Sequence, residues 1–142
     1  MRILVLNGPN INMLGIREPD IYGKETFADL LQLLQQWAKD FDVEIEQFQS
    51  NHEGDLVDKI QSAYNTFDAI VINPAAYTHT SIAILDALKS VALPAVEVHI
   101  SDPNTREEFR HISYAGLACV KTIKGLGLTG YKEAIRYLTK KC

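Results

Sequence analysis

The sequence contains little cysteine, no long apolar run and no block of basic residues. Cys119 and Cys142 are the two cysteines among 142 residues, too few for a disulfide framework, so we expect a reducing, cytoplasmic compartment. No apolar stretch approaches the roughly 20 residues of a membrane span, and the first one, residues 2–7, ends too soon to form the core of a signal peptide. Lysine and arginine are scattered and the net charge is −4, which argues against nucleic acid as a partner. These absences predict a protein with neither a membrane nor a nucleic-acid partner.

Segments rich in β-branched and aliphatic residues alternate with segments of helical periodicity. The strands are predicted at 2–7, 43–49, 68–73, 94–100 and 117–124, and the helices at 26–41, 54–64, 81–91 and 129–140. The strand at 68–73 is apolar throughout, which is typical of a parallel sheet covered on both faces. No repeat or linker interrupts the pattern. It predicts one α/β domain over residues 1–142, with a doubly wound, flavodoxin-like sheet of five parallel strands and helices on both faces.

Ligands of open α/β sheets bind beyond the carboxyl ends of the strands. The segments expected there are 8–24, 73–79 and 99–110. The first of them is longer than the usual connection of about two to six residues, which is typical of a binding loop. It ends on Gly23 and Lys24 as a phosphate-binding loop does, but Glu18 and Glu25 occupy positions where that motif needs glycine and Ser or Thr. Nucleotide hydrolysis is therefore not expected.

A second glycine pattern lies near the end of the chain. Gly125, Gly127 and Gly130 satisfy the dinucleotide-binding pattern G-x-G-x-x-G. Only 12 residues follow Gly130, which leaves no room for the next strand and its acidic residue. We interpret these glycines as a turn into the last helix.

Two predicted strand ends carry polar residues suited to acid–base chemistry. Glu97 and His99 share one face of a strand, where a carboxylate can fix the tautomer of an imidazole and stabilise its protonated form, as a general acid requires. The alternative is a polar pair without a catalytic role. Asn73 ends another strand and His79 follows it. The alternative there is a helix that starts at Thr80 or Ser81, with His79 as a solvated loop residue.

Metal and nucleophile motifs are missing from the same segments. His79, Glu97, His99 and Asp102 could supply metal ligands, but no H-E-x-x-H or C-x-x-C spacing occurs, so no metal is expected. No G-x-S-x-G elbow occurs and neither cysteine lies in a motif, which argues against acyl transfer. The remaining chemistry is an acid–base site built from Tyr, Arg, His and Asn.

Long stretches of the chain resemble the type II 3-dehydroquinate dehydratases. The matching segments are 6–15, 17–19, 22–23, 50–54, 73–81, 96–101, 106–111 and 125–127. The resemblance implies a flavodoxin-like fold and a dodecamer built as four trimers. It also implies dehydration of 3-dehydroquinate to 3-dehydroshikimate in the shikimate pathway, without a metal, a Schiff base or another cofactor.

The resemblance also implies roles for individual residues. Tyr22 corresponds to the proton acceptor, His99 to the proton donor and Arg17 to the loop arginine that supports the tyrosinate. Further residues correspond to substrate-binding positions: Asn73, His79, Asp86 and Arg110, with Ile100 and Ser101 in the carboxylate site.

A tyrosine base needs a cation beside it. Free tyrosine has a pKa near 10, so only about 0.1% is ionised at pH 7, and lowering the pKa by two units takes about 2.7 kcal/mol. A guanidinium ~4 Å away supplies up to about 4 kcal/mol at an effective dielectric of 20, and Arg17 and Arg110 are the candidates. Asn10 could hold a water against the enolate oxygen, and Glu97 would orient His99.

The predicted helix at 81–91 is apolar nearly all round, which indicates burial on both sides. In a small domain this favours a subunit interface in which Asp86 reaches a neighbour's site; the alternative is a helix covered by its own domain's loops. The rival to an enzyme is a non-catalytic flavodoxin-like module that binds a small anion or a nucleotide in the same crevice.

Overall fold

Five parallel strands form one sheet in the order β2-β1-β3-β4-β5. The computed structural model describes residues 1–16 and 18–141, apart from the side chains of Tyr22 and Lys141. The strands are β1 (Arg2–Asn7), β2 (Glu44–Gln49), β3 (Ala69–Asn73), β4 (Ala95–His99) and β5 (Lys121–Lys124). This order is the flavodoxin-like one, so the predicted fold class is confirmed.

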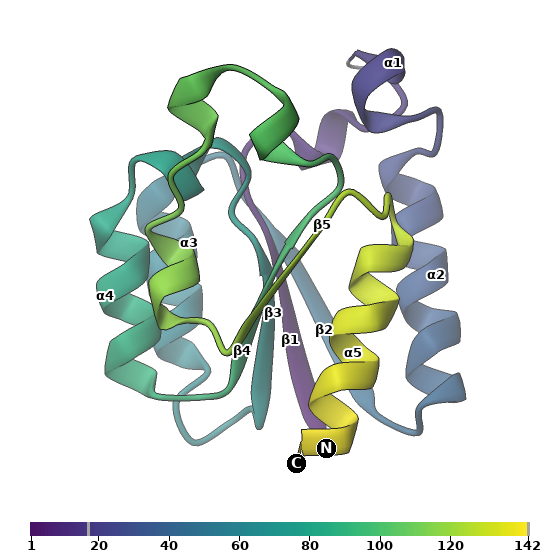
Figure 1. Cartoon of the computed structure of the whole chain (residues 1–142). Helices are drawn as coiled ribbons and strands as arrows, with labels where there is room; N and C mark the ends of the chain where they lie inside the picture. The colour runs from purple at the N-terminus through teal and green to yellow at the C-terminus, as the bar shows by residue number, and fades with distance from the viewer. Residues whose placement is uncertain (17, 142) are drawn as a thin grey trace.

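Helices cover both faces of the sheet (Figure 1). α2 (Phe27–Asp40) and α5 (Thr129–Lys141) pack on one face, and α3 (Glu53–Ser62) and α4 (Ile82–Val91) on the other. β3 and β4 are buried at every position, because side chains on both of their faces meet a helical layer. None of the helices in the described part of the chain is long and apolar enough to cross a membrane.

Local capping explains where the helices begin. Thr26 and Asp29 form a capping box at the start of α2, in which each side chain accepts a hydrogen bond from the backbone N–H of the other. Ser81 caps α4 by accepting from the backbone N–H of Ile84 at 2.9 Å. Of the two residues that the sequence offered, Thr80 and Ser81, Ser81 is therefore the cap.

The fifth strand is shorter than predicted, because residues 115–118 form a 3-10 turn, η5 (Ala115–Ala118), instead of strand. Gly116 donates its backbone N–H to Ser113 Oγ at 2.9 Å, and a Cβ on Gly116 would lie 2.9 Å from Glu97 Oε1. The turn therefore lies closely over the buried Glu97. The apolar run at 117–120 has the composition of a strand, but strand β5 begins only at Lys121.

Short elements gather at the carboxyl ends of the strands, at the top of Figure 1. They are η1 (Ile11–Met13), α1 (Pro19–Tyr22), η2 (Ala75–His79), η3 (Pro103–Thr105) and η4 (Glu108–Arg110). The N-terminus lies at the opposite end of the sheet (Figure 1). The loops that the sequence assigned to ligand binding are thus brought to one edge.

Candidate active site

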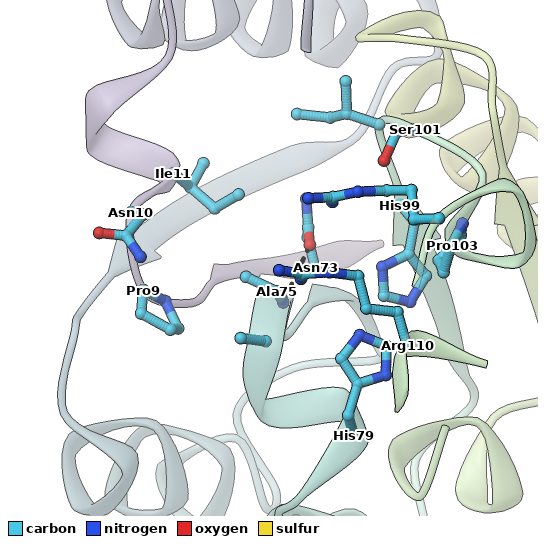
Figure 2. A pocket seen from close by; sticks show the side chains of 13 residues that line it. Pro9, Asn10, Ile11, Asn73, Ala75, His79, His99, Ser101, Pro103 and Arg110 are labelled. Carbon is cyan, nitrogen blue, oxygen red and sulfur yellow. Dashed lines mark hydrogen bonds between the residues drawn. The ribbon is translucent and has the colours of Figure 1, made fainter. Parts of the chain in front are cut away.

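A pocket lies at the carboxyl ends of β1, β3 and β4, where the chain leaves these strands in different directions. It encloses about 510 Å³, part of it open to solvent. Its lining residues are Pro9–Ile11, Asn73, Ala75, Ala76, His79, His99–Ser101, Pro103, Arg106 and Arg110. Figure 2 shows Pro9, Asn10 and Ile11 on one side, His79, His99, Pro103 and Arg110 on the other, and Asn73 between them.

The loops that form the pocket approach each other closely. A Cβ on Gly8 would lie 2.4 Å from the backbone oxygen of Pro74, so the loop after β1 touches the loop after β3. Asn10 and Ala75 both adopt positive φ, 69° and 53°, a conformation that residues other than glycine adopt at a cost. Asn10 is held there by its backbone N–H, which donates to Asn51 Oδ1 at 3.1 Å. Strained backbone on two sides of one pocket is typical of a functional site.

Glu97 is fully buried on β4 and accepts hydrogen bonds from four side chains. His99 Nε2 donates to Glu97 Oε2 at 2.8 Å, Ser113 Oγ donates at 2.7 Å, and Thr78 Oγ1 donates to the same oxygen. Thr122 Oγ1 donates to Oε1 at 3.0 Å. Burial alone would raise the pKa of Glu97, but His99 and the hydroxyl donors lower that pKa from 4.5 to about 2. Glu97 is therefore a carboxylate at neutral pH.

This hydrogen bond assigns the two ring nitrogens of His99 to different tasks. A carboxylate can only accept, so Nε2 carries a hydrogen and Nδ1 is the nitrogen left to give or take a proton. The His99 side chain is 10% exposed and lines the pocket. The pairing of Glu97 with His99 that their spacing predicted is therefore present, and a histidine held in this way at a pocket is suited to general acid chemistry.

His79 has the opposite assignment of its ring nitrogens. Nδ1 donates to the backbone oxygen of Ile112 at 2.6 Å, which leaves Nε2 as an acceptor in the neutral ring. Burial lowers the pKa of His79, and the nearby charges of His99 and Arg110 lower it further against the opposing effect of Ile112. The partly buried ring lines the pocket and is held in one orientation by this hydrogen bond.

The pocket is lined by cations in a protein whose net charge is −4. Arg110 forms an ion pair with Glu107 through Nε at 2.7 Å and extends toward Asn73 (Figure 2). Arg106 also lines the pocket, with 14% of its side chain exposed. None of the described residues that line it carries a carboxylate. The pocket therefore favours a small anion.

Most of the predicted site residues meet at this pocket. Those that line it are Asn10, Asn73, His79, His99, Ile100, Ser101 and Arg110, with Glu97 directly behind His99. Asp86 does not line it and lies exposed on α4 beside Ile82, which is 54% exposed. The chain's own loops leave this face of α4 open, so the alternative of a helix covered by those loops is wrong. Arg17 and the side chain of Tyr22 lie outside the described residues.

Sequence reasoning missed three kinds of residue around the site. Arg106 stood in a quoted motif but received no role, although an arginine beside the expected carboxylate site was a usable signal. Ser113 and Thr122 come from distant segments and meet Glu97 only in three dimensions. Tyr131 received no role from the sequence, but its hydroxyl accepts a hydrogen bond from the Asn73 amide.

The glycine pattern near the end of the chain and the candidate metal ligands can both be compared with the structure. Gly125 and Gly127 form a turn whose backbone N–H groups donate to the carbonyl oxygens of His99 and Ile100, at 3.2 and 3.0 Å. The glycine pattern is thus a turn into α5 that fixes the end of β4, as interpreted from the sequence. Within residues 1–16 and 18–141, no three His, Cys, Asp or Glu side chains gather closely enough to hold a metal ion.

Comparison with known proteins shows to which family the chain belongs. The sequence model of the family described as dehydroquinase class II matches residues 1–139. The chain belongs to the class II dehydroquinase family. Among the family's members, the 3-dehydroquinate dehydratase of Endomicrobium trichonymphae is 58% identical over 95% of this chain and 94% of its own length. The catabolic 3-dehydroquinase of Talaromyces marneffei is 53% identical over 98% of this chain and 79% of its own length.

A solved class II structure has the same fold throughout. The crystal structure of the type II dehydroquinase from Butyrivibrio crossotus matches with a TM-score of 0.96 and 54% identity, over 97% of each chain. The resemblance found in the sequence motifs is confirmed.

Proposed function

We propose that the chain is a type II 3-dehydroquinate dehydratase that converts 3-dehydroquinate to 3-dehydroshikimate in the shikimate pathway. The observation that carries the proposal is the Glu97–His99 pair at a pocket lined by arginines. Class II relatives named 3-dehydroquinate dehydratase support the substrate.

The pocket suits a small carboxylate that also carries hydroxyl groups. Arg106 and Arg110 supply positive charge, while Ser101 and the backbone after β4 supply hydrogen-bond donors and acceptors. Neutral His79 offers Nε2 as an acceptor for a substrate hydroxyl, because Ile112 occupies Nδ1. Asn73 and Asn10 contribute amides on the facing side, and Asn10 holds a water against the enolate oxygen.

The reaction is an elimination of water next to a ketone. A base removes a proton from the carbon beside the ketone, and the electron pair of that C–H bond forms the enolate. The enolate collapses to an enone as the C–O bond at the next carbon breaks, and His99 Nδ1 gives its proton to the departing hydroxyl to form water. Glu97 stabilises the imidazolium before this transfer and holds Nε2 after it.

The base in this proposal is Tyr22, assigned from the sequence resemblance. Arg17 supports its ionised form, and Arg110 adds positive charge from the other side of the pocket. Arg17 and Tyr22 lie five residues apart in the sequence, so in this proposal a single segment supplies both the base and the cation.

The proposal extends to assembly and location. We infer a cytoplasmic dodecamer of four trimers, in which the exposed face of α4 meets a neighbouring subunit and Asp86 reaches that subunit's pocket. The apolar Ile82 on this face fits an interface better than solvent.

The experiment is an absorbance assay for the conjugated enone product, with purified protein, 3-dehydroquinate and a chelator. The proposal predicts steady product formation that the chelator does not change. Absence of product, with binding of a small anion or nucleotide retained, would contradict it in favour of the non-catalytic module.

A further inference from the structure

Three buried polar side chains form a hydrogen-bonded chain behind the pocket. Asn73 Nδ2 donates to the hydroxyl of Tyr131 at 2.9 Å, and that hydroxyl donates to Asn7 Oδ1 at 2.6 Å. Asn7 and Tyr131 are fully buried and Asn73 is 2% exposed. Of the three, Asn73 lines the pocket.

The direction of this chain is fixed at one end. The backbone N–H of Ala75 donates to Asn73 Oδ1 at 3.1 Å, so Oδ1 is the acceptor and Nδ2 faces Tyr131. The Tyr131 oxygen receives a hydrogen from Asn73 and must give its own to Asn7. Burial raises the pKa of Tyr131, so the hydroxyl keeps its proton over the working range of pH.

Filling the core with these polar side chains lowers the stability of the fold relative to an apolar core. Asn7 Nδ2 has no partner among the described residues, and a buried unpaired donor is destabilising. Apolar side chains of similar shape would avoid this loss. The three hydrogen-bonded side chains are explained if they serve to fix the orientation of the Asn73 amide, the one amide among them that reaches the pocket.

Helix α5 is seated so that Tyr131 can reach the ends of two strands. A Cβ on the neighbouring Gly130 would lie 3.2 Å from Val98 Cγ1, so the helix lies close against β4 at this point. The Tyr131 hydroxyl then lies between Asn7 at the end of β1 and Asn73 at the end of β3, which are paired in register. The C-terminal helix is thereby joined to the pocket.

We propose that Tyr131 is a positioning residue: with Asn7 behind it, it holds the Asn73 amide so that the second hydrogen of Nδ2 is directed at a substrate oxygen. The inference rests on the proposed dehydratase function for its kinetic consequence. Tyr131 itself touches no reacting atom and acts through Asn73.

The test begins with Tyr131→Phe, which removes the hydroxyl and keeps the ring. Asn73 loses one of its two clamps, so we expect KM for 3-dehydroquinate to rise about threefold to tenfold, with kcat changed less than about twofold. The matched control is Ile135→Val, a fully buried position one turn further along α5 that also weakens the core. It should lower the melting temperature while leaving KM unchanged.

A double-mutant cycle separates positioning from a general loss of packing. In an Asn73→Ala background, Tyr131→Phe should add nothing to KM, because the amide through which it acts is gone. An equal rise in KM with and without Asn73, or wild-type KM in Tyr131→Phe, would overturn the inference.

A readout that needs no turnover distinguishes this inference from the proposed function. The side-chain amide protons of Asn73, assigned by their loss in Asn73→Ala, should exchange slowly in the wild type and faster in Tyr131→Phe. If they respond in this way while no enone forms, the dehydratase function fails and the positioning stands. If enone forms but neither the amide exchange nor KM responds, the positioning fails and the function stands.

Discussion

Glu97→Gln removes one charge from the site while keeping its shape. The glutamine oxygen can accept from His99, Ser113 and Thr78 in place of Glu97 Oε2, and its amide can donate to Thr122, whose hydroxyl also accepts. The fold and the orientation of His99 are therefore expected to survive. The protonated form of His99 loses its ionic partner at 2.8 Å.

The size of the effect follows from the difference between two kinds of hydrogen bond. A bond to a charged group contributes about 1.5–3 kcal/mol and a neutral one about 0.5–1.5 kcal/mol, so the imidazolium loses roughly 1–2 kcal/mol. At 1.4 kcal/mol per factor of ten, kcat near pH 7 should fall about fivefold to thirtyfold.

The assay is kcat at pH 7, followed by enone absorbance. Thr122→Val is the matched control: it removes the donor to Oε1 but keeps the carboxylate beside His99, so kcat should stay near that of the wild type. An unchanged kcat in Glu97→Gln, or an equal fall in both variants, would refute the reasoning.

The same substitution has a consequence for stability at low pH. Because the pKa of Glu97 lies at about 2 instead of 4.5, its ionised form contributes up to about 3 kcal/mol above pH 4.5, and this is lost as the pH falls toward 2. Denaturant unfolding should therefore show the wild type losing stability over this window more steeply than Glu97→Gln. Parallel curves would contradict the low pKa.

Two further predictions concern the base and the neighbouring subunit. Tyr22→Phe should abolish turnover while a product analogue still binds, and its loss should be far from additive with that of Arg17→Ala, because both disable one step; substantial turnover would exclude Tyr22 as the base. Asp86→Ala and His99→Ala should each lower activity when assembled alone. Oligomers mixed from the two variants should regain activity, because some sites then combine an intact His99 with a neighbour's Asp86. No recovery of activity in proven hybrids would count against a shared site.

The sequence predicted the fold well because its signals are local and strong. β3 is an apolar run bounded by turn residues, and the helix predicted at 26–41 is observed as α2 (Phe27–Asp40). The shortened β5 shows the limit of this reasoning. A short apolar run is compatible with either a strand or a turn, and the turn at 115–118 packs against α4 and β4, which are distant in the sequence.

The site was predictable where one strand carried the chemistry and not where distant segments meet. Glu97 and His99 lie two residues apart, so strand geometry alone pairs them. Tyr131 lies 58 residues from Asn73, and its position in an amphipathic helix gives it the pattern of a core residue. Hydrophobic periodicity predicts which residues are buried, but it does not predict the hydrogen-bond partner of a buried hydroxyl.

The central claim is that His99, held by Glu97, is the acid of a dehydratase site. Turnover of 3-dehydroquinate by His99→Ala tests it most directly, with His52→Ala, an exposed histidine outside the pocket, as the matched control. We expect kcat of His99→Ala to fall about a hundredfold to ten-thousandfold with a smaller change in KM, and the control to keep the activity of the wild type. Near-normal turnover by folded His99→Ala would contradict it and transfer the acid role to His79 or to water.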